Sequence, residues 1–413
     1  MRVCIHRGAQ QVGGSCIEVE HEGARLVLDA GVPLESELGA DHLPLSIPTL
    51  IDGDPAIIGL VISHGHPDHY GLVEQVHSSV PVYVGEATQR VLREAAFFTG
   101  TGVDIHAAGH LRDGVPLELG PFTVTPFLVD HSAFDAYALL VEAAGQRLLY
   151  SGDLRAHGRK AALFERLLRE PPSDIDVLLL EGTNIRDEAA TPGPSERDVE
   201  DRCTELFQAT SGMVLASYSA QNIDRLVTLF RAAKRSGRLL VMDLYAATMA
   251  RATGRDSIPQ ADWDGVRVFV PLSQRIKVKR AGEFERVAWL RGRRLFAEDL
   301  AGRAGELVMT FRGSMTRELD AAACLEGAHA VWSMWSGYLD EPSGLRLREW
   351  VSARNIPLSV LHSSGHASPL DLQRLAAAIN AKELVPVHTR QPGRYTELFS
   401  NVRTHADGEW WTV

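Results

Sequence analysis

The chain has 413 residues, a formal net charge of −11 at pH 7 and 45% hydrophobic residues. This length predicts two or three domains with substantial cores. The acidic balance argues against a protein that binds nucleic acid over its whole surface, because lysine and arginine supply most phosphate affinity. We expect a cytoplasmic protein that stays out of membranes, because no apolar run reaches about 18 residues, the start lacks a signal-peptide pattern and the four cysteines are scattered.

The charge is unevenly distributed along the chain. Residues 231–299 hold 15 Lys/Arg against 8 Asp/Glu, whereas the remainder holds 27 against 45. A local basic excess suits a confined track for phosphates, although a solvated helical surface explains many of the same residues. Within this stretch we take Arg275, Lys277, Lys279 and Arg280 as candidate substrate contacts.

The first elements in chain order are three short predicted strands, Val3–His6, Ser15–Val19 and Arg25–Asp29. Asp29 closes the third strand, where its carboxylate either orients a ligand histidine or completes a local turn. In the proline-containing stretch 32–50, Asp41 and His42 either touch substrate or belong to an ordinary surface loop.

A dense cluster of metal-binding side chains follows the next predicted strand, the apolar run 57–62. The cluster is Ser63-His64-Gly65-His66-Pro67-Asp68-His69-Tyr70-Gly71, and a helix over 68–79 is expected to follow. His64 and His66 are alternate residues that can converge on one cation, while Asp68 and His69 can face a second. Imidazoles suit zinc and similar metals, and a carboxylate suits a harder, water-rich position. Three histidines and one aspartate in six residues are too dense for a merely solvated loop.

Later predicted strands also end in polar side chains. These strand–terminus pairs are Phe122–Val129 with Asp130-His131, Arg147–Tyr150 with Asp153, Asp176–Leu180 with Glu181, Leu358–Leu361 with His362 to His366, and Glu383–Val387 with His388. A lone histidine at such a position is usually structural or solvated. Because an earlier strand end already carries candidate ligands, repeated strand-end histidines in the last part of the chain predict a shared site.

Residues between the Glu181 strand and the His362 strand are predicted to form a separate domain. Strands and helices alternate there, over Met213–Ser217, Gln221–Ser236, Arg238–Met242, Val266–Pro271, Glu306–Thr310 and Ala328–Met334. This alternation predicts a mostly parallel α/β sheet with its own core. Ser195 with Asp198 predicts the N-cap of its first helix.

The run His64-Gly65-His66-Pro67-Asp68-His69 resembles the HxHxDH signature of the metallo-β-lactamase superfamily. This resemblance implies an α/β fold, a four-layer αβ/βα sandwich with a two-metal site along one edge. It implies that His131 joins His64 and His66 as a ligand and that Asp153 bridges the two cations. It also favours the orienting role of Asp29.

The last third of the chain resembles the β-CASP branch of that superfamily, which includes ribonuclease J. The additional motifs of the branch are matched by Glu181, by His366 in Ser364-Gly365-His366-Ala367-Ser368, and by His388 in Pro386-Val387-His388-Thr389. The resemblance implies that His388 completes the ligand set of Asp68 and His69. It places His366 over the scissile phosphate, with Glu181 orienting it and with Ser364 and Gly365 contacting a phosphate oxygen.

The domain organisation implied by this resemblance is a metallo-β-lactamase domain over 1–185 and 357–413 with a β-CASP insertion over 186–356. The implied enzyme hydrolyses phosphodiester bonds of single-stranded nucleic acid, RNA favoured over DNA. Its two divalent metal ions per chain would activate a water, with Zn²⁺ favoured and Mn²⁺ as the alternative. Exonuclease or endonuclease action and strand polarity are left open.

Two other functions compete with a nuclease. A small-molecule metallohydrolase, such as a lactonase or thioesterase, shares the first motifs but needs neither the insertion nor His366. An inactive scaffold subunit is expected to lack ligands, whereas every expected ligand is present. The chain also departs from ribonuclease J, because His388-Thr389-Arg390 differs from its motif and Val413 follows soon afterwards. A homodimer is therefore left open.

Overall fold

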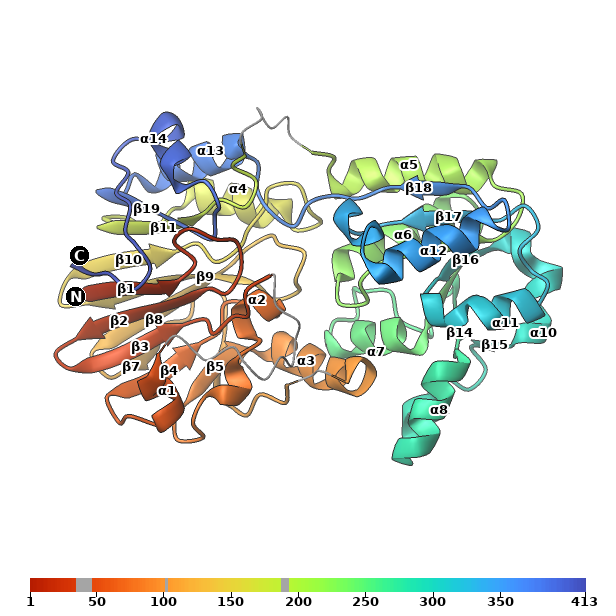
Figure 1. Cartoon of the computed structure of the whole chain (residues 1–413), viewed down its shortest axis with the longest axis horizontal. Coiled ribbons are helices and arrows are strands. Elements are labelled where there is room, and N and C mark those ends of the chain that lie inside the picture. Colours follow the sequence, from red (N-terminus) through yellow and green to blue (C-terminus); the bar gives the residue numbers. More distant parts are fainter. Residues whose placement is uncertain (35–46, 101–102, 187–192) are drawn as a thin grey trace. The chain divides into compact units, whose positions relative to one another are not determined.

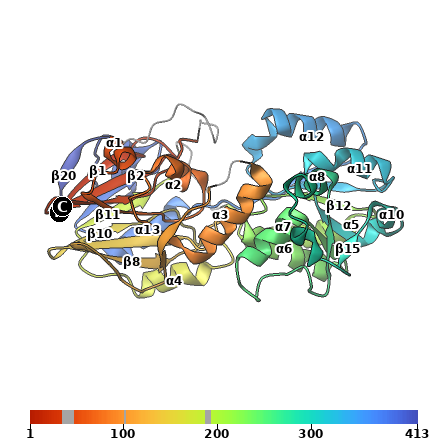
Figure 2. The same cartoon turned by 90° about the horizontal axis from the view of Figure 1, so that it is seen from below.

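The computed structural model describes residues 1–34, 47–100, 103–186 and 193–413. Residue contacts divide the chain into two compact units, Met1–Gly193 with Gly365–Val413, and Pro194–Ser364. Figures 1 and 2 show the elements of each unit from two directions. Among the described residues, no helix combines the length and apolar character that crossing a lipid bilayer requires.

The first unit contains two mixed sheets, with strand orders β20-β1-β2-β3-β4-β5-β6 and β19-β11-β10-β9-β8-β7. The strands of the first sheet are β1 (Arg2–Arg7), β2 (Cys16–His21), β3 (Ala24–Leu28), β4 (Ile57–Val61), β5 (Val82–Gly85), β6 (Ala107–Leu111) and β20 (Trp410–Thr412). Those of the second are β7 (Leu117–Leu119), β8 (Phe122–Leu128), β9 (Tyr137–Ala143), β10 (Gln146–Tyr150), β11 (Val177–Glu181) and β19 (Glu383–Val387).

Apolar side chains of both sheets form a shared core, to which β1 contributes Val3 and Ile5 and β9 contributes Leu139 and Val141. Helices cover the outer faces of the sheets. On the first sheet these are α1 (Pro48–Asp52), α2 (Pro67–Tyr70) and α3 (Glu86–Thr99), and on the second α4 (Ala161–Arg169), α13 (Pro369–Ile379) and α14 (Tyr395–Leu398). This is the four-layer αβ/βα sandwich that the sequence motifs implied.

The second unit is built on one sheet of parallel strand pairs in the order β15-β14-β13-β16-β12-β17-β18. Its strands are β12 (Val214–Ser217), β13 (Leu239–Asp243), β14 (Val266–Phe269), β15 (Arg294–Leu295), β16 (Leu307–Thr310), β17 (His329–Trp332) and β18 (Leu358–Val360). Its helices are α5 (Glu196–Ala209), α6 (Ile223–Arg235), α7 (Leu244–Ala252), α8 (Leu272–Ala281), α9 (Glu285–Ala288), α10 (Ala297–Leu300), α11 (Thr316–Ala321) and α12 (Pro342–Ser352). The predicted N-cap of α5 is confirmed, because the Ser195 hydroxyl accepts from the Asp198 N–H.

Three details differ from the sequence prediction. The predicted helix over 68–79 ends at Tyr70, because the Leu72 N–H donates to the Ala30 carbonyl instead of continuing the helix. Residues 357–364 belong to the second unit, because β18 pairs with β17. Strands β6, β15 and β20 were not predicted; β20 has three residues and gains its order from pairing with β1.

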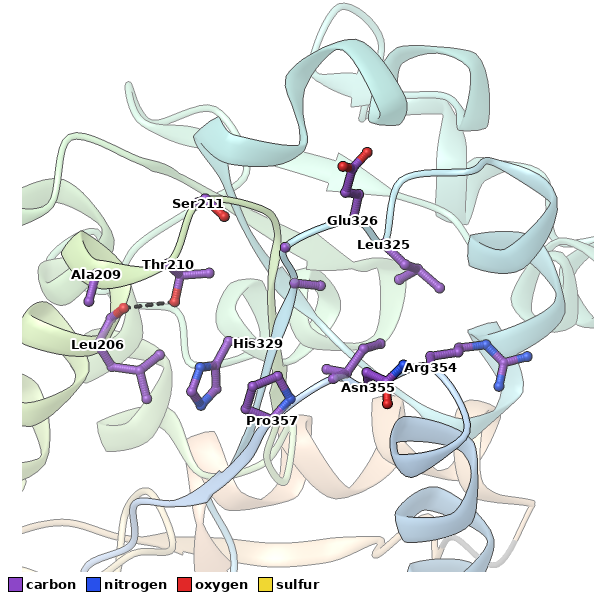
Figure 3. A pocket seen from close by; sticks show the side chains of 13 residues that line it. Leu206, Ala209, Thr210, Ser211, Leu325, Glu326, His329, Arg354, Asn355 and Pro357 are labelled. Carbon is purple, nitrogen blue, oxygen red and sulfur yellow. Dashed lines mark hydrogen bonds between the residues drawn. The ribbon is translucent and has the colours of Figure 1, made fainter.

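The second unit has a hollow of about 570 Å³, lined by the end of α5 and by the segments that lead into β17 and β18. Figure 3 shows the side chains that line it. Several of its polar side chains already have partners. Thr210 donates to the Leu206 carbonyl, His329 bonds to the Ser359 hydroxyl, and Arg354 pairs with Asp320. Ligands of open α/β sheets bind beyond the carboxyl ends of the strands, whereas this hollow lies at their amino ends. We therefore assign it no substrate.

Candidate metal centre

The candidate ligands of the first unit come from strand ends and the turns that follow them. His64 and His66 follow β4, and Asp68 and His69 lie on the short helix α2. The ligands that follow β8, β10 and β19 are His131, Asp153 and His388, and Glu181 is the last residue of β11. Because β10, β11 and β19 are parallel neighbours, their carboxyl ends meet at one edge of the sheet.

A first group of possible metal ligands consists of His64, His66 and His131. The ring centroid of His131 lies 4.7 Å from that of His64 and 4.8 Å from that of His66. The Nδ1–H of His131 donates to the Gly365 carbonyl at 2.6 Å, which leaves its Nε2 directed at His66. Three imidazoles around one point form the nitrogen-rich set that zinc prefers.

A second group consists of Asp68, His69, Asp153 and His388. The Nε2 of His69 lies 3.2 Å from Asp153 Oδ2, and the Nε2 of His388 lies 3.4 Å from Asp68 Oδ2. His388 Nδ1 donates to Asp153 Oδ1 at 2.6 Å. Asp153 Oδ2 is also 3.7 Å from His64 Nε2, so this one carboxylate faces both groups.

The carboxylate of Asp29 holds His69 in position. Its Oδ2 accepts from His69 Nδ1 at 2.7 Å and also accepts from the hydroxyls of Ser63 and Tyr150, each at 2.8 Å. The backbone N–H of Ser63 donates to Oδ1 at 2.7 Å. A proton fixed on Nδ1 directs Nε2 toward the candidate metal position. The structure thus places Asp29 where an orienting carboxylate is needed.

The two groups differ in their electrostatics. Burial lowers the pKa of His66 to about 4 and holds the pKa values of His64 and His131 well below the usual range. Burial also disfavours charge on His388, but the Asp153 carboxylate outweighs it and raises the pKa of His388 to about 10. The pKa of His69 is likewise raised, because Asp153 and Asp29 outweigh burial. The first group is therefore neutral at pH 7, whereas the second carries protons.

Four buried atoms indicate that these residues suit cations. Among the described residues, the Nε2 atoms of His64, His69 and His388 and Oδ2 of Asp153 form no hydrogen bond, although they converge on the same region. Buried polar atoms are almost always hydrogen-bonded, so such a set of exceptions needs an explanation. Imidazole nitrogens and carboxylate oxygens are ligands of divalent cations, and these atoms fit that role.

A third group consists of Asp153, Glu181 and His366. His366 Nδ1 lies 3.4 Å from Glu181 Oε1 and 3.7 Å from Asp153 Oδ2. Glu181 is completely buried, and its carboxylate accepts from the N–H groups of Leu154 and Thr183 at 3.4 and 3.1 Å. The structure therefore brings His366 and Glu181 together beside Asp153.

The remaining predicted site residues fall in different places. Gly365 uses its carbonyl to orient His131, a role that its assignment as a phosphate contact did not anticipate. Ser364 and the basic residues of α8 belong to the second unit, so their expected approach to substrate stays a prediction. Asp41 and His42 lie outside the described residues.

Sequence reasoning missed the side chains that support the ligands. Ser63 and Tyr150 bond to Asp29, and the Lys160 ammonium donates to the His131 carbonyl at 3.1 Å. Ser63 could have been suspected, because it directly precedes the histidine motif. Tyr150 ends an ordinary apolar strand and Lys160 precedes α4, so neither carries a local signal in the sequence.

Comparison with known proteins agrees with this geometry. Residues 24–213 match the family model described as a beta-lactamase superfamily domain. Over these residues the chain resembles the metallo-β-lactamase superfamily. Its relatives include the protein named Ribonuclease J from Mycobacterium tuberculosis (strain CDC 1551 / Oshkosh), which is 29% identical over 249 residues, 58% of this chain and 43% of that protein. Ribonuclease J from Mycoplasma pneumoniae is 25% identical over 402 residues, 92% of this chain and 66% of that protein.

The aligned regions thus cover between 43% and 66% of the length of these two relatives. Ribonuclease J is a member of the β-CASP branch, so these relatives agree with the branch that the motifs indicated. The fold also matches a crystal structure of a protein of unknown function from Enterococcus faecalis V583. The TM-score is 0.79 and the identity 20%, and the match covers 100% of this chain and 99% of the other. This last likeness bears on the fold alone.

We predict that changing Asp68 and His69 together to Ala removes about half of the bound divalent metal and most hydrolytic activity, because both side chains serve one of two cation positions. Metal content after dialysis against Zn²⁺ and thermal unfolding are the measurements. Changing the exposed pair Asp104 and His106 to Ala removes the same residue types and is the matched control. Wild-type metal content and activity in the Asp68/His69 variant would contradict two separate positions.

We also predict that metal binding at pH 7 releases protons from the second group and not from the first. The imidazoles of the second group have raised pKa values and must lose protons, whereas those of the first are already neutral. As the pH falls, the second group should lose its cation first. Calorimetry in buffers of different ionisation enthalpy measures proton release, and the Asp68/His69 variant isolates the first group. Equal proton release in the variant and the wild type is the contrary result.

Proposed function

We propose that this chain is a metal-dependent nuclease that hydrolyses phosphodiester bonds of single-stranded nucleic acid, with RNA favoured over DNA. The observation that carries the proposal is the third group, in which His366 stands between Glu181 and Asp153 in addition to two complete ligand sets. The relatives named Ribonuclease J support the same class of reaction.

The two ligand sets would provide for the attack of water on the phosphodiester. His64, His66 and His131 would hold one cation, and Asp68, His69 and His388 would hold the other, with Asp153 shared. Two divalent cations, for which we favour Zn²⁺ and keep Mn²⁺ as the alternative, would supply an activated water and offset the charge that develops on phosphorus. Asp29, Ser63 and Tyr150 keep His69 in the tautomer that this requires.

In this proposal, His366 assists the departure of the leaving-group oxygen. Burial disfavours its charge, but the carboxylates of Glu181 and Asp153 outweigh burial and raise its pKa, which favours the protonated ring. Its backbone carbonyl accepts from the Asn184 amide at 2.9 Å, which fixes the loop that carries it. A held, protonated imidazole can donate a proton to an alkoxide leaving group or stabilise charge on the phosphate.

A small-molecule metallohydrolase remains the alternative function, because it would use the same two ligand sets. It gives no reason for the His366–Glu181 pair or for a second unit with its own sheet. Turnover of a single-stranded oligonucleotide against simple esters and thioesters separates the two functions. The inactive scaffold is disfavoured by the complete ligand sets, and the metal content of the purified protein tests it.

We predict that His366→Ala lowers phosphodiester cleavage by roughly 10²-fold or more, while metal content and thermal stability stay near wild type. Glu181→Gln should also lower cleavage, because His366 loses a negative neighbour and its pKa falls. End-labelled RNA and DNA of one sequence, with products resolved under Zn²⁺ and Mn²⁺, provide the readout. His106→Ala is the control for loss of an exposed histidine.

Either of two results would overturn this assignment. Loss of one metal equivalent in the His366 variant would make His366 a ligand. Full nuclease activity would exclude it from the chemistry.

We predict that reversing charges on α8 weakens binding of single-stranded oligonucleotide, and more strongly at low salt than at high salt. Lys279 and Arg280 are both exposed, whereas Arg275 already pairs with Glu318 at 2.8 Å. Lys279→Glu with Arg280→Glu is therefore the sharpest variant. Arg169→Glu with Arg403→Glu changes net charge equally on the first unit and serves as control. Equal losses in both variants would show that only total charge matters.

A further inference from the structure

An exposed pair of aromatic side chains follows β17 in the second unit. Trp335 is 54% exposed and Tyr338 is 43% exposed, although both are large enough to favour burial. Their rings meet edge to face, with centroids 5.3 Å apart and an interplanar angle of 89°. Such pairs at a protein surface commonly mark a recognition site.

The tryptophan ring is held in place by its own turn. A Cβ at Gly337 would lie 2.2 Å from the Trp335 ring, so the indole packs directly on the glycine backbone. The Trp332 indole N–H donates to the Trp335 carbonyl at 3.1 Å, and Leu339 anchors the 3₁₀ turn Ser336–Leu339 in the core. The exposed ring is therefore pre-positioned, which reduces the entropy cost of binding a flat ligand.

The aromatic turn begins at the carboxyl end of β17. The segment that leads to His366 begins at the carboxyl end of the neighbouring strand β18. Strands β17 and β18 are parallel neighbours, and the Leu361 N–H donates to the Trp332 carbonyl at 2.9 Å. The chain continues from Leu361 through residues 362–365 to His366. Carboxyl ends of parallel strands are where open α/β sheets bind their ligands.

A buried arginine is part of a hydrogen-bond network that links the residues directly after β17 to those directly after β18. Arg225 donates to the Ser333 carbonyl at 2.6 Å, and the Ser333 hydroxyl donates to the Leu361 carbonyl at 2.5 Å. Arg225 is completely buried and pairs with Glu196 at 2.8 Å. The residues that precede the aromatic turn and Leu361, the first residue after β18, thus belong to one hydrogen-bond network.

We propose that the exposed Trp335 ring, with Tyr338 packed edge to face against it, forms a stacking platform for one base of the single-stranded nucleic acid that the enzyme cleaves. This inference rests on the proposed nuclease function. A nucleobase suits this site, because the indole is a flat ring held by its own turn and the turn follows the carboxyl end of a parallel strand. Every base has a flat face to stack, so the contact is independent of sequence. The adjacent carboxylate of Asp340 is paired with Arg348 at 3.1 Å, which reduces its repulsion of phosphates.

The test uses a fluorescent single-stranded RNA of 12 nucleotides and a series with one abasic position each. Binding is measured by anisotropy with metal-loaded protein that also carries His366→Ala, so that the oligonucleotide persists. Trp335→Ala should weaken binding by about tenfold, the usual scale for one stacked base. Gly337→Ala keeps both rings but displaces the indole, so it should weaken binding as well. Phe296→Ala removes another half-exposed aromatic of the second unit and should change nothing.

The abasic series separates stacking from a general structural defect. In the parent protein, one or two abasic positions should weaken binding, and in Trp335→Ala those positions should no longer matter. Parental affinity in Trp335→Ala, a uniform loss at every position, or no binding by the parent would overturn the platform. If Gly337→Ala does not fold, Tyr338→Ala takes its place.

The same experiment distinguishes the platform from the nuclease function. If wild-type protein cleaves RNA and Trp335→Ala cleaves with unchanged KM, the nuclease stands and the platform falls. If wild-type protein binds with a position-dependent abasic profile but cleaves nothing, the platform stands and the nuclease falls.

Discussion

The buried carboxylate of Asp153 is the centre on which the candidate site depends. It lies within 3.7 Å of imidazole nitrogens from His64 and His366 and closer still to those of His69 and His388. A buried negative charge is costly unless it is compensated. Protons on the imidazoles compensate it when no cation is bound, and cations can replace those protons. The raised pKa values of the second group therefore reflect the same field that would hold a metal.

The parts of the site that were predictable from the sequence are those encoded within a few residues. The run from His64 to His69 is one short segment, and strand-end positions made His131, Asp153 and His388 candidates once the superfamily pattern was recognised. The orienting role of Asp29 was also expected from the superfamily pattern. The contribution of Tyr150 was not predictable, since Tyr150 ends a strand of the second sheet and reaches Asp29, at the end of a strand of the first sheet, only in the folded chain. The overlong helix prediction failed for the same reason, because a tertiary bond to Ala30 redirects Leu72.

Close backbone approach explains why the ligand helix lies where it does. A Cβ at Gly31 would lie 1.7 Å from the Asp68 carbonyl, so only glycine allows α2 to pack against the end of β3. The Ala30 and Ser15 N–H groups then donate to the His69 and Asp68 carbonyls at 2.8 and 3.1 Å. These bonds fix the main chain of two ligands without using any ligand side chain.

Main-chain carbonyls take part in holding both the candidate ligand His131 and the exposed aromatic turn. The Gly365 carbonyl orients His131, and the Leu361 and Ser333 carbonyls receive the bonds that anchor the aromatic turn. A carbonyl makes these bonds whatever side chain its residue carries. Side chains of the exposed turn, such as Trp335, can therefore be exchanged without removing these bonds. This separation of roles allows one chain to combine a metal motif in the first unit with an exposed turn in the second unit that no motif predicted.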